Sequence, residues 1–219
     1  MKKFWISNLM KQLVPTLIID LLLWFGFIKL ESKLLLTLAI LGILFACFSI
    51  WFFRNPKRNV PDLPNSLISP ADGKIVAIKK EKDNFFFEGR EVTRISIFLN
   101  VFNVHINRIP IDGEIVYENY NHGKFINAFS EKASLDNEQN MIGIKTKHGN
   151  ILVKQIAGLI ARRIIAVKGL GDEVKQGQIY GMIKFGSRTD ILIEEDINIK
   201  VNIGDKVKGG ETIIGDFYE

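Results

Sequence analysis

The sequence is nearly without cysteine and has few histidines, and each shortage excludes a kind of chemistry. Its only cysteine, Cys47, lies inside an apolar run, so a disulfide framework is excluded and thiol chemistry is not expected. The three histidines, His105, His122 and His148, are scattered without the spacing of a metal-binding cluster. We therefore expect neither a disulfide-stabilised domain nor a metal site.

A large excess of one charge is also missing. Lysine and arginine total 29 against 24 aspartate and glutamate residues, which gives a formal net charge of +5. This excess is compatible with nucleic acid, with an anionic membrane surface or with ordinary solubility. No basic helix and no platform of interleaved aromatic and basic residues accompanies it, so we expect no nucleic-acid partner.

Long amphipathic helical patterns are missing after Pro61. The chain there consists of short β-branched and aromatic runs, which are separated by turn signals such as Asp-Gly at 72–73 and 112–113. The runs are KIVAI, RISIFL, GEIVYENY, MIGIKT, NILVKQIA, RRIIAV, YGMIKF, DILIEE and NIKVNI. This pattern makes a doubly wound nucleotide-binding sheet improbable and predicts a mainly β domain of the α+β class.

Two apolar runs stand near the N-terminus. The run 34–53 has no charged residue, and at about 1.5 Å per residue it is long enough to cross a hydrocarbon core of about 30 Å. The run 13–28 is shorter and carries Asp20, which costs about 2.5–3.5 kcal/mol at the centre of a membrane helix. We expect residues 1–53 to form a membrane anchor of one or two transmembrane helices, arranged as a hairpin, and the crossing of 13–28 stays open.

Basic residues flank this anchor. A hairpin would bring Lys2, Lys3 and Lys11 to the same side as Arg54, Lys57 and Arg58. The positive-inside rule makes that side cytoplasmic. A cleaved signal peptide is not expected, because the second run is too long and no small-residue cleavage site follows it. We therefore expect the domain that follows the anchor, residues 54–219, to lie on the cytoplasmic side of the cell (inner) membrane, where anionic lipid attracts the basic segment 54–58.

Two stretches near the C-terminus resemble each other. They read GDEVKQGQIYG at 171–181 and GDKVKGGETIIG at 204–215, and each predicts a strand and a hairpin with glycine at the turns. The pattern is similar to the hairpins of lipoyl-like barrel-sandwich domains, but neither copy has a lysine in the context of a swinging arm. A membrane-anchored, lipoyl-like adaptor of the efflux or membrane-fusion type is the alternative function, although such adaptors insert a long helical hairpin that is not seen here.

Between these repeats the segment KFGSRTD, 184–190, contains a Gly-Ser pair. Such a pair commonly marks only a turn. Gly186, however, leaves its carbonyl unguarded by a side chain and permits a strained backbone, so the Ser187 hydroxyl can attack the preceding peptide bond. The resulting ester can undergo β-elimination to dehydroalanine, which loses ammonia and becomes a pyruvoyl group.

Several separated blocks resemble one family. The blocks are RNPKR at 54–58, SPADGK at 69–74, FLNVFNVHINRIPIDGEI at 98–115, GKFINA at 123–128, QIAGLIARRI at 155–164 and GQIYGMIKFGSRTD at 177–190. In this order they are similar to the short, type A phosphatidylserine decarboxylases of bacteria. The resemblance extends from about Trp51 to the C-terminus.

The resemblance implies an inactive precursor that cleaves itself between Gly186 and Ser187. Residues 1–186 become the β chain, and residues 187–219 become the α chain, which carries the pyruvoyl group derived from Ser187. It also implies that Asp72 and His105 are partners of Ser187 in self-cleavage. This covalent group replaces pyridoxal phosphate, and no metal is expected.

The physical roles of these residues agree with that reading. His105 can accept and return a hydroxyl proton near neutral pH, and Asp72 could orient and stabilise the imidazolium. The alternatives are a structural turn for Asp72 and a hydrogen-bonded core position for His105. We expect His122 and His148, which lie beside glycines, to be solvated loop residues.

Arg108 marks a departure from longer relatives, which carry a second histidine three residues after the first. Its planar guanidinium could hold the carboxylate or phosphate of the substrate. Whether His105 serves both self-cleavage and decarboxylation stays open.

The implied activity is that of a carboxy-lyase. Phosphatidylserine would form a Schiff base with the pyruvoyl group, lose CO2 and leave phosphatidylethanolamine. The expected partners are phosphatidylserine, an anionic membrane surface and the two chains of one precursor. The sequence leaves acyl-chain preference and homo-oligomerisation open.

Overall fold

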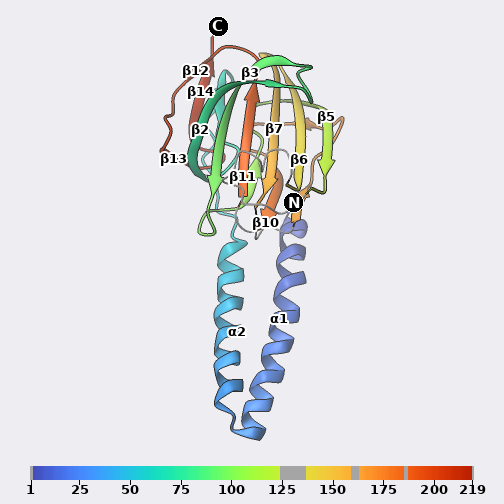
Figure 1. The fold of residues 1–219 in the computed structure, drawn as a ribbon, viewed down its shortest axis with the longest axis vertical. Coiled ribbons are helices and arrows are strands. Elements are labelled where there is room, and N and C mark those ends of the chain that lie inside the picture. The colour runs from blue at the N-terminus through green and yellow to red at the C-terminus, as the bar shows by residue number, and fades with distance from the viewer. Residues whose placement is uncertain (1, 124–136, 159–162, 185–186, 219) are drawn as a thin grey trace. The chain divides into compact units, whose positions relative to one another are not determined.

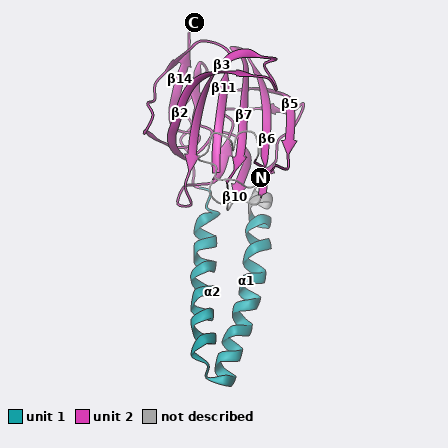
Figure 2. Ribbon diagram, viewed as in Figure 1, with its two compact units in different colours: residues 1–55 teal, residues 56–219 magenta. Residues whose placement is uncertain are grey.

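The computed structural model describes residues 2–123, 137–158, 163–184 and 187–218 (Figure 1). The chain divides into two compact units, a helical unit of residues 1–55 and a β-rich unit of residues 56–219 (Figure 2). The sequence-based boundary lies between residues 53 and 54. The expected mainly β domain preceded by N-terminal helices is confirmed.

Unit 1 is a pair of antiparallel helices, α1 (Lys2–Leu30) and α2 (Lys33–Phe52). By length and composition, both are apolar enough to cross a membrane. The helix α1 begins well before residue 13, because lysine and glutamine favour helix although they do not favour lipid. Between the helices Glu31 adopts a left-handed conformation, with φ 48°, and this allows the tight reversal.

Asp20 of α1 is accommodated by a glycine of α2. A Cβ atom built on Gly42 would lie 2.3 Å from Oδ1 of Asp20, so the missing side chain of Gly42 makes room for the carboxyl. Asp20 is 7% exposed, although most of the apolar side chains around it on α1 are open. The carboxyl therefore packs against the neighbouring helix and does not face the side that lipid would cover. This lowers the free-energy cost of placing a polar group in an apolar helix.

Unit 2 is built from short strands. They are β1 (Ser66–Ile68), β2 (Gly73–Asp83), β3 (Arg90–Leu99), β4 (Ile106–Arg108), β5 (Gly113–Asn121), β6 (Gln139–Thr146), β7 (Gly149–Ala157), β8 (Arg163–Ala166), β9 (Glu173–Val174), β10 (Ile179–Lys184), β11 (Ser187–Ile193), β12 (Ile197–Ile199), β13 (Lys206–Val207) and β14 (Ile213–Phe217). Several strand bounds differ from the sequence-based runs. The run NIKVNI was predicted as one strand, but β12 ends at Ile199, and β11 begins at Ser187, before the run DILIEE.

The strands form an eight-stranded sheet in the order β13-β2-β3-β11-β7-β6-β5-β9 and two three-stranded sheets, β1-β14-β12 and β4-β10-β8. All pairings are antiparallel, and the large sheet curls around the small ones (Figure 1). Alternate residues of the large sheet, such as Ile95, Val153 and Ile191, point into one main apolar core.

The two C-terminal repeats fold alike. In the first, Gly171 and Gly177 have positive φ and bracket β9; in the second, Gly204 and Gly210 have positive φ and bracket β13. Positive φ is inexpensive only for glycine, which explains why both copies keep glycine at these places. The short strand of each repeat pairs with the start of a long one, β9 with β5 and β13 with β2.

A second repeat, which the sequence reasoning missed, relates ISPADG at 68–73 to RIPIDG at 108–113. The two segments exchange backbone hydrogen bonds: Ile68 N–H donates to the Pro110 carbonyl (3.0 Å), and Arg108 N–H donates to the Pro70 carbonyl (2.8 Å). The order of the large sheet is likewise symmetrical about the β11–β7 pair. Unit 2 therefore consists of two similar halves related by an approximate two-fold axis.

Candidate active site

Ser187 begins the central strand β11. It pairs with Leu99 of β3 on one side and with Ala157 of β7 on the other, and it is fully buried. Its hydroxyl makes no hydrogen bond to any residue that the structure describes. Buried hydroxyl groups nearly always have a hydrogen-bond partner, so the Ser187 hydroxyl is an exception. Gly186, the other residue of the predicted junction, lies outside the described residues.

His105 immediately precedes β4 and is 1% exposed. Its Nδ1 lies 3.0 Å from the carbonyl oxygen of Asn103, which fixes the orientation of the ring. Its own carbonyl accepts a hydrogen bond from Ile183 N–H (3.1 Å) on β10. The strand β10 ends at Lys184, close in sequence to Ser187, so His105 and Ser187 lie at the same end of unit 2.

A line of buried polar side chains crosses the interior next to Ser187. Asn107 Nδ2 donates to Thr189 Oγ1 (3.0 Å), Gln155 Nε2 donates to Asn107 Oδ1 (2.8 Å), and Asn140 Nδ2 donates to Gln155 Oε1 (3.1 Å). All four side chains are buried. Gly181 leaves room for Gln155, because a Cβ there would lie 2.8 Å from Nε2. This polar line ties β4 to the centre of the large sheet.

The polar line also relates His105 to Ser187. The strand β4 runs antiparallel to β10. Asn107 and Thr189 are in contact, and each strand repeats its side-chain direction every second residue. His105 lies two residues before Asn107, and Ser187 lies two residues before Thr189. Both candidate residues therefore lie close in sequence to the hydrogen bond that joins β4 to β11.

Asp72 lies in the turn before β2, and its hydrogen bonds to described residues come from Arg58 and Gly209. Arg58 Nη2 donates to both carboxylate oxygens (2.8 and 2.9 Å), and Gly209 N–H donates to Oδ1 (2.8 Å). The Arg58 side chain is 7% exposed, so this residue is packed against Asp72 instead of facing lipid headgroups as the sequence suggested. In this structure the direct neighbour of His105 Nδ1 is the Asn103 carbonyl.

Arg108 belongs to the same charged group as Asp72. Its Nη1 donates to the Gly177 carbonyl (2.9 Å), and it faces away from the interior that Asn107 occupies. Burial lowers the pKa of the Arg108 guanidinium, and the neighbouring Arg58 lowers it further, whereas Asp72 and Glu211 act in the opposite direction. The group is thus two arginines balanced by two carboxylates.

The remaining histidines are not part of this arrangement. His122 is exposed and packs edge-on against Tyr120 (4.9 Å between ring centroids). His148 is half-buried and stacks on Phe217 (4.7 Å, 3°), so its predicted solvation was wrong. Within the described part of the chain, no three His, Cys, Asp or Glu side chains gather as metal ligands.

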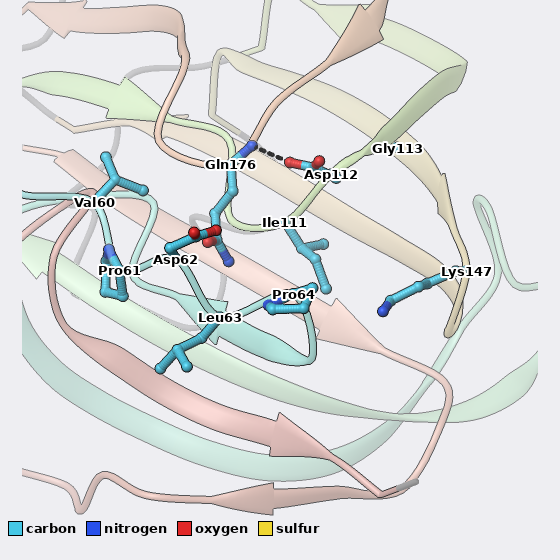
Figure 3. Close-up of a pocket in the computed structure, with 10 residues that line it drawn as sticks. All are labelled: Val60, Pro61, Asp62, Leu63, Pro64, Ile111, Asp112, Gly113, Lys147 and Gln176. Atoms are coloured by element: carbon cyan, nitrogen blue, oxygen red, sulfur yellow. Dashed lines mark hydrogen bonds between the residues drawn. The ribbon is translucent and has the colours of Figure 1, made fainter.

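A cavity of about 540 Å³ lies elsewhere in unit 2 (Figure 3). It adjoins the second Asp-Gly turn, where Gln176 N–H donates to Asp112 (2.6 Å). Its walls are Val60, Pro61, Asp62, Leu63, Pro64, Ile111, Asp112, Gly113, Lys147 and Gln176. None of these is a predicted site residue, so this cavity is separate from the candidate active site.

The sequence reasoning named Ser187 and His105 as candidates but did not name Asn107, Gln155, Asn140 and Thr189. A signal for them was present, because amide side chains occupy strand positions in NVHIN and VKQIA where apolar residues would be expected. Polar side chains at such positions are buried only when their hydrogen bonds are satisfied by one another.

Comparison with known proteins assigns the family. The sequence profile described as phosphatidylserine decarboxylase matches residues 45–215. A phosphatidylserine decarboxylase proenzyme of Syntrophotalea carbinolica is 46% identical, over 87% of this chain and 90% of the relative. Proenzymes of the same description from Geotalea uraniireducens and Carboxydothermus hydrogenoformans are 42% and 45% identical, covering 87% and 81% of this chain and 90% and 84% of the relatives. The chain belongs to the phosphatidylserine decarboxylase family.

Proposed function

We propose that this protein decarboxylates phosphatidylserine to phosphatidylethanolamine and CO2, after cleaving itself between Gly186 and Ser187. The observation that carries the proposal is the buried hydroxyl of Ser187, which has no hydrogen bond to a described residue at the start of a central strand. The description of the relatives as proenzymes supports a precursor that must be processed.

Self-cleavage begins with the Ser187 hydroxyl. His105 takes the hydroxyl proton as Oγ attacks the carbonyl carbon of residue 186, and the peptide C–N bond breaks to leave an ester. Loss of the α-proton of residue 187 then expels the carboxylate of residue 186 and leaves dehydroalanine. Addition of water and loss of ammonia complete the change. The β chain is then 1–186 and the α chain 187–219.

His105 is proposed as the base because both it and Ser187 lie close in sequence to the hydrogen bond that joins β4 to β11, and because its ring is fixed. The contact between Nδ1 and the Asn103 carbonyl assigns the proton on the ring to Nδ1, and this leaves Nε2 to accept the hydroxyl proton. After maturation the same nitrogen is suited to deliver the proton that replaces CO2 at the α-carbon of the substrate.

Asp72 and Arg108 are proposed as supporting residues at the outer side of β4. Asp72 holds Arg58 and the backbone of Gly209, so it keeps the turn 208–211 against β4 and acts on His105 through that position. Arg108, half-buried beside this pair, is proposed to bind the phosphate or carboxylate of the headgroup.

The residues around Ser187 fit a pyruvoyl group. The position is enclosed between Leu99 and Ala157, and conversion of the serine removes a buried hydroxyl that has no described partner. A pyruvoyl group there would supply an electrophilic carbonyl for the substrate amine and a sink for the electrons released with CO2. Burial excludes water from that chemistry.

The location of this reaction is proposed to be the cytoplasmic face of the cell (inner) membrane. The helices α1 and α2 support an anchor by their length and composition, and the basic residues that flank them favour the cytoplasmic side. The substrate is a bilayer lipid, so an anchor keeps the enzyme where its substrate is.

Intact-protein mass of the purified full chain tests the proposal. The unaltered protein is expected as two chains, with a blocked residue 187 on the smaller one, and Ser187→Ala is expected as one inactive chain. Ser96→Ala is the matched control, because Ser96 is a buried serine on the adjacent strand β3. A single, uncut and active unaltered chain would overturn the proposal.

A further inference from the structure

One exposed aromatic side chain lies on the turn beside the candidate active site. Phe102 is 67% exposed, and it sits between Leu99, which pairs with Ser187, and His105. The turn therefore joins the two strands that bring the reactive residues together. In Figure 1 the loop after β3 projects from unit 2 at the end where β10 finishes.

The exposure of Phe102 is fixed by the turn. Asn100 N–H donates to Asn103 Oδ1 (2.9 Å), Phe102 N–H donates to Asn100 Oδ1 (2.9 Å), and Asn103 N–H donates to the Asn100 carbonyl (3.0 Å). Two asparagine side chains thus hold the backbone closed beneath the ring. A fixed turn presents an apolar side chain outward without the entropic cost of ordering a loose loop.

Basic side chains stand at the same end. Exposed Lys74 pairs with Phe98 where β2 meets the end of β3, and exposed Arg163 pairs with Lys184 at the end of β10. Two acidic side chains close to this end are already engaged, because Asp72 accepts from Arg58 and Glu138 accepts from Ile164 N–H (3.0 Å) and from Tyr120. Two exposed basic side chains therefore stand at the same end of unit 2 as the turn.

We propose that the turn 100–103 inserts Phe102 into the headgroup region of an anionic phospholipid bilayer, beside the reactive residue. An exposed aromatic ring at the same end as lysine and arginine side chains is the combination that favours such an interface. The inference rests on the proposed function, since a bilayer lipid must reach residue 187, which is fully buried, while its acyl chains stay in the membrane. A turn that enters the headgroup region brings the mouth of the site to that lipid.

Tyr218 provides a matched control. It is 66% exposed, and it lies with His148 and Glu195 beyond the far end of β11, at the opposite end of the sheet from Ser187. The same substitution at Phe102 and Tyr218 removes a similar amount of exposed aromatic surface. Of these two positions, only residue 102 is expected to contact lipid.

The first experiment measures contact directly in the full chain, reconstituted in nanodiscs of phosphatidylglycerol and phosphatidylcholine. Phe102→Cys and Tyr218→Cys, each in a Cys47→Ala background, carry an environment-sensitive fluorophore. We expect a blue-shifted emission at 102 that spin-labelled headgroups quench, and water-like emission at 218. Water-like emission at 102 would overturn the proposal, and so would a blue shift that lipid spin labels do not quench, because protein would then cover the turn.

The second experiment measures the consequence for turnover. In Phe102→Ser the KM for phosphatidylserine in vesicles is expected to rise about tenfold, while a water-soluble short-chain phosphatidylserine is turned over within about twofold of the unaltered rate. Phe102→Trp should restore the vesicle KM, and Tyr218→Ser should change neither. An equal loss on both substrates would overturn the membrane role. If the proposed function itself failed, no substrate would react, whereas the fluorescence would still report lipid contact.

Discussion

Asp72 and Asp112 occupy equivalent positions in the two halves of unit 2, and only their cations differ. Asp72 accepts a hydrogen bond from Gly209 N–H (2.8 Å), and Asp112 accepts one from Gln176 N–H (2.6 Å), at matching places in the two C-terminal repeats. Asp112 is paired with exposed Lys175, whereas Asp72 is paired with buried Arg58. The hydrogen bond from the backbone N–H to the aspartate is thus common to both halves of the fold, and buried Arg58 is found only at Asp72.

This equivalence predicts different outcomes for the same substitution. Asp112→Asn should cost less than about 1 kcal/mol, because its ion pair with Lys175 is exposed to solvent. Asp72→Asn should cost more, about 2 kcal/mol, and slow precursor cleavage, because buried Arg58 loses its closer counter-charge and keeps, among the described residues, only Glu211 at 3.8 Å. Denaturant unfolding and a gel time course measure both effects. Equal effects of the two substitutions would mean that Asp72 only closes its turn.

His105 should be required for self-cleavage. His105→Ala removes the proposed base for the Ser187 hydroxyl, so precursor cleavage should slow by about a hundredfold or more. His148→Ala is the control, because His148 stacks on Phe217 beyond the other end of β11. The fraction of uncut chain on a gel, followed over time after synthesis, measures both. Cleavage of His105→Ala at the normal rate would remove His105 from this step.

Local sequence patterns predicted the helices and strands of this protein better than the contacts between them. The apolar runs indicated both helices, and the short β-branched runs indicated most of the long strands, because each signal is contained in a few neighbouring residues. The helix α1 was predicted too short because the argument considered only residues suited to lipid. The short strands β1 and β4 were missed, since three residues carry too little periodicity to be seen.

Much of the candidate site depends on contacts between residues far apart in sequence. Ser187 and His105 were predicted because their blocks resemble a family, whereas the hydrogen bond from Asn107 to Thr189 depends on the packing of β4 against β11. The pairing of Arg58 with Asp72 was likewise unexpected, because a basic segment next to an anchor usually faces lipid. Tertiary packing decides which of these side chains pair, and no local sequence pattern encodes it.

The helical hairpin should depend on the fit between Asp20 and Gly42. Gly42→Ala places a Cβ 2.3 Å from Asp20 Oδ1 but 3.6 Å from Asp20 Cβ, so the single variant should destabilise the hairpin and the double variant Asp20→Ala, Gly42→Ala should recover it. Thermal unfolding of the full chain in detergent, read as a double-mutant cycle, measures the coupling. Cys47→Val, at an exposed position of α2, is the control. Additive effects would show that the two residues are not in contact.

Acid should destabilise unit 2 through Asp83. Burial acts to raise the pKa of this carboxyl, but the hydrogen bond from Lys154 (2.7 Å) and the N–H groups of Phe86 and Phe87 outweigh it, and the pKa is lowered. A lowered pKa stabilises the fold above the ordinary carboxyl range, and this stabilisation is lost as pH falls through the folded-state value.

The matching test compares stability between about pH 3 and pH 7, which spans the ordinary carboxyl range. Asp83→Asn should lose about 3 kcal/mol at neutral pH, because Lys154 is left buried without its partner, and should show a flatter loss in acid than the unaltered chain. Denaturant midpoints at each pH provide the measurement. Parallel pH profiles for the two proteins would exclude Asp83 as the source of the acid sensitivity.

Arg108 should separate processing from turnover. Its side chain bonds to the Gly177 carbonyl and faces away from the interior that holds Asn107, so Arg108→Lys should be cleaved at the normal rate. An ammonium keeps the charge but loses the planar, two-pronged contact with a phosphate or carboxylate, so the KM for phosphatidylserine should rise about tenfold with kcat nearly unchanged. Processing is followed by gel and CO2 release by assay, and the unfolding midpoint controls for damage to the charged group around Arg58. A blocked cleavage in a stably folded Arg108→Lys would place this residue in the self-cleavage step, and an unchanged KM would remove it from substrate binding.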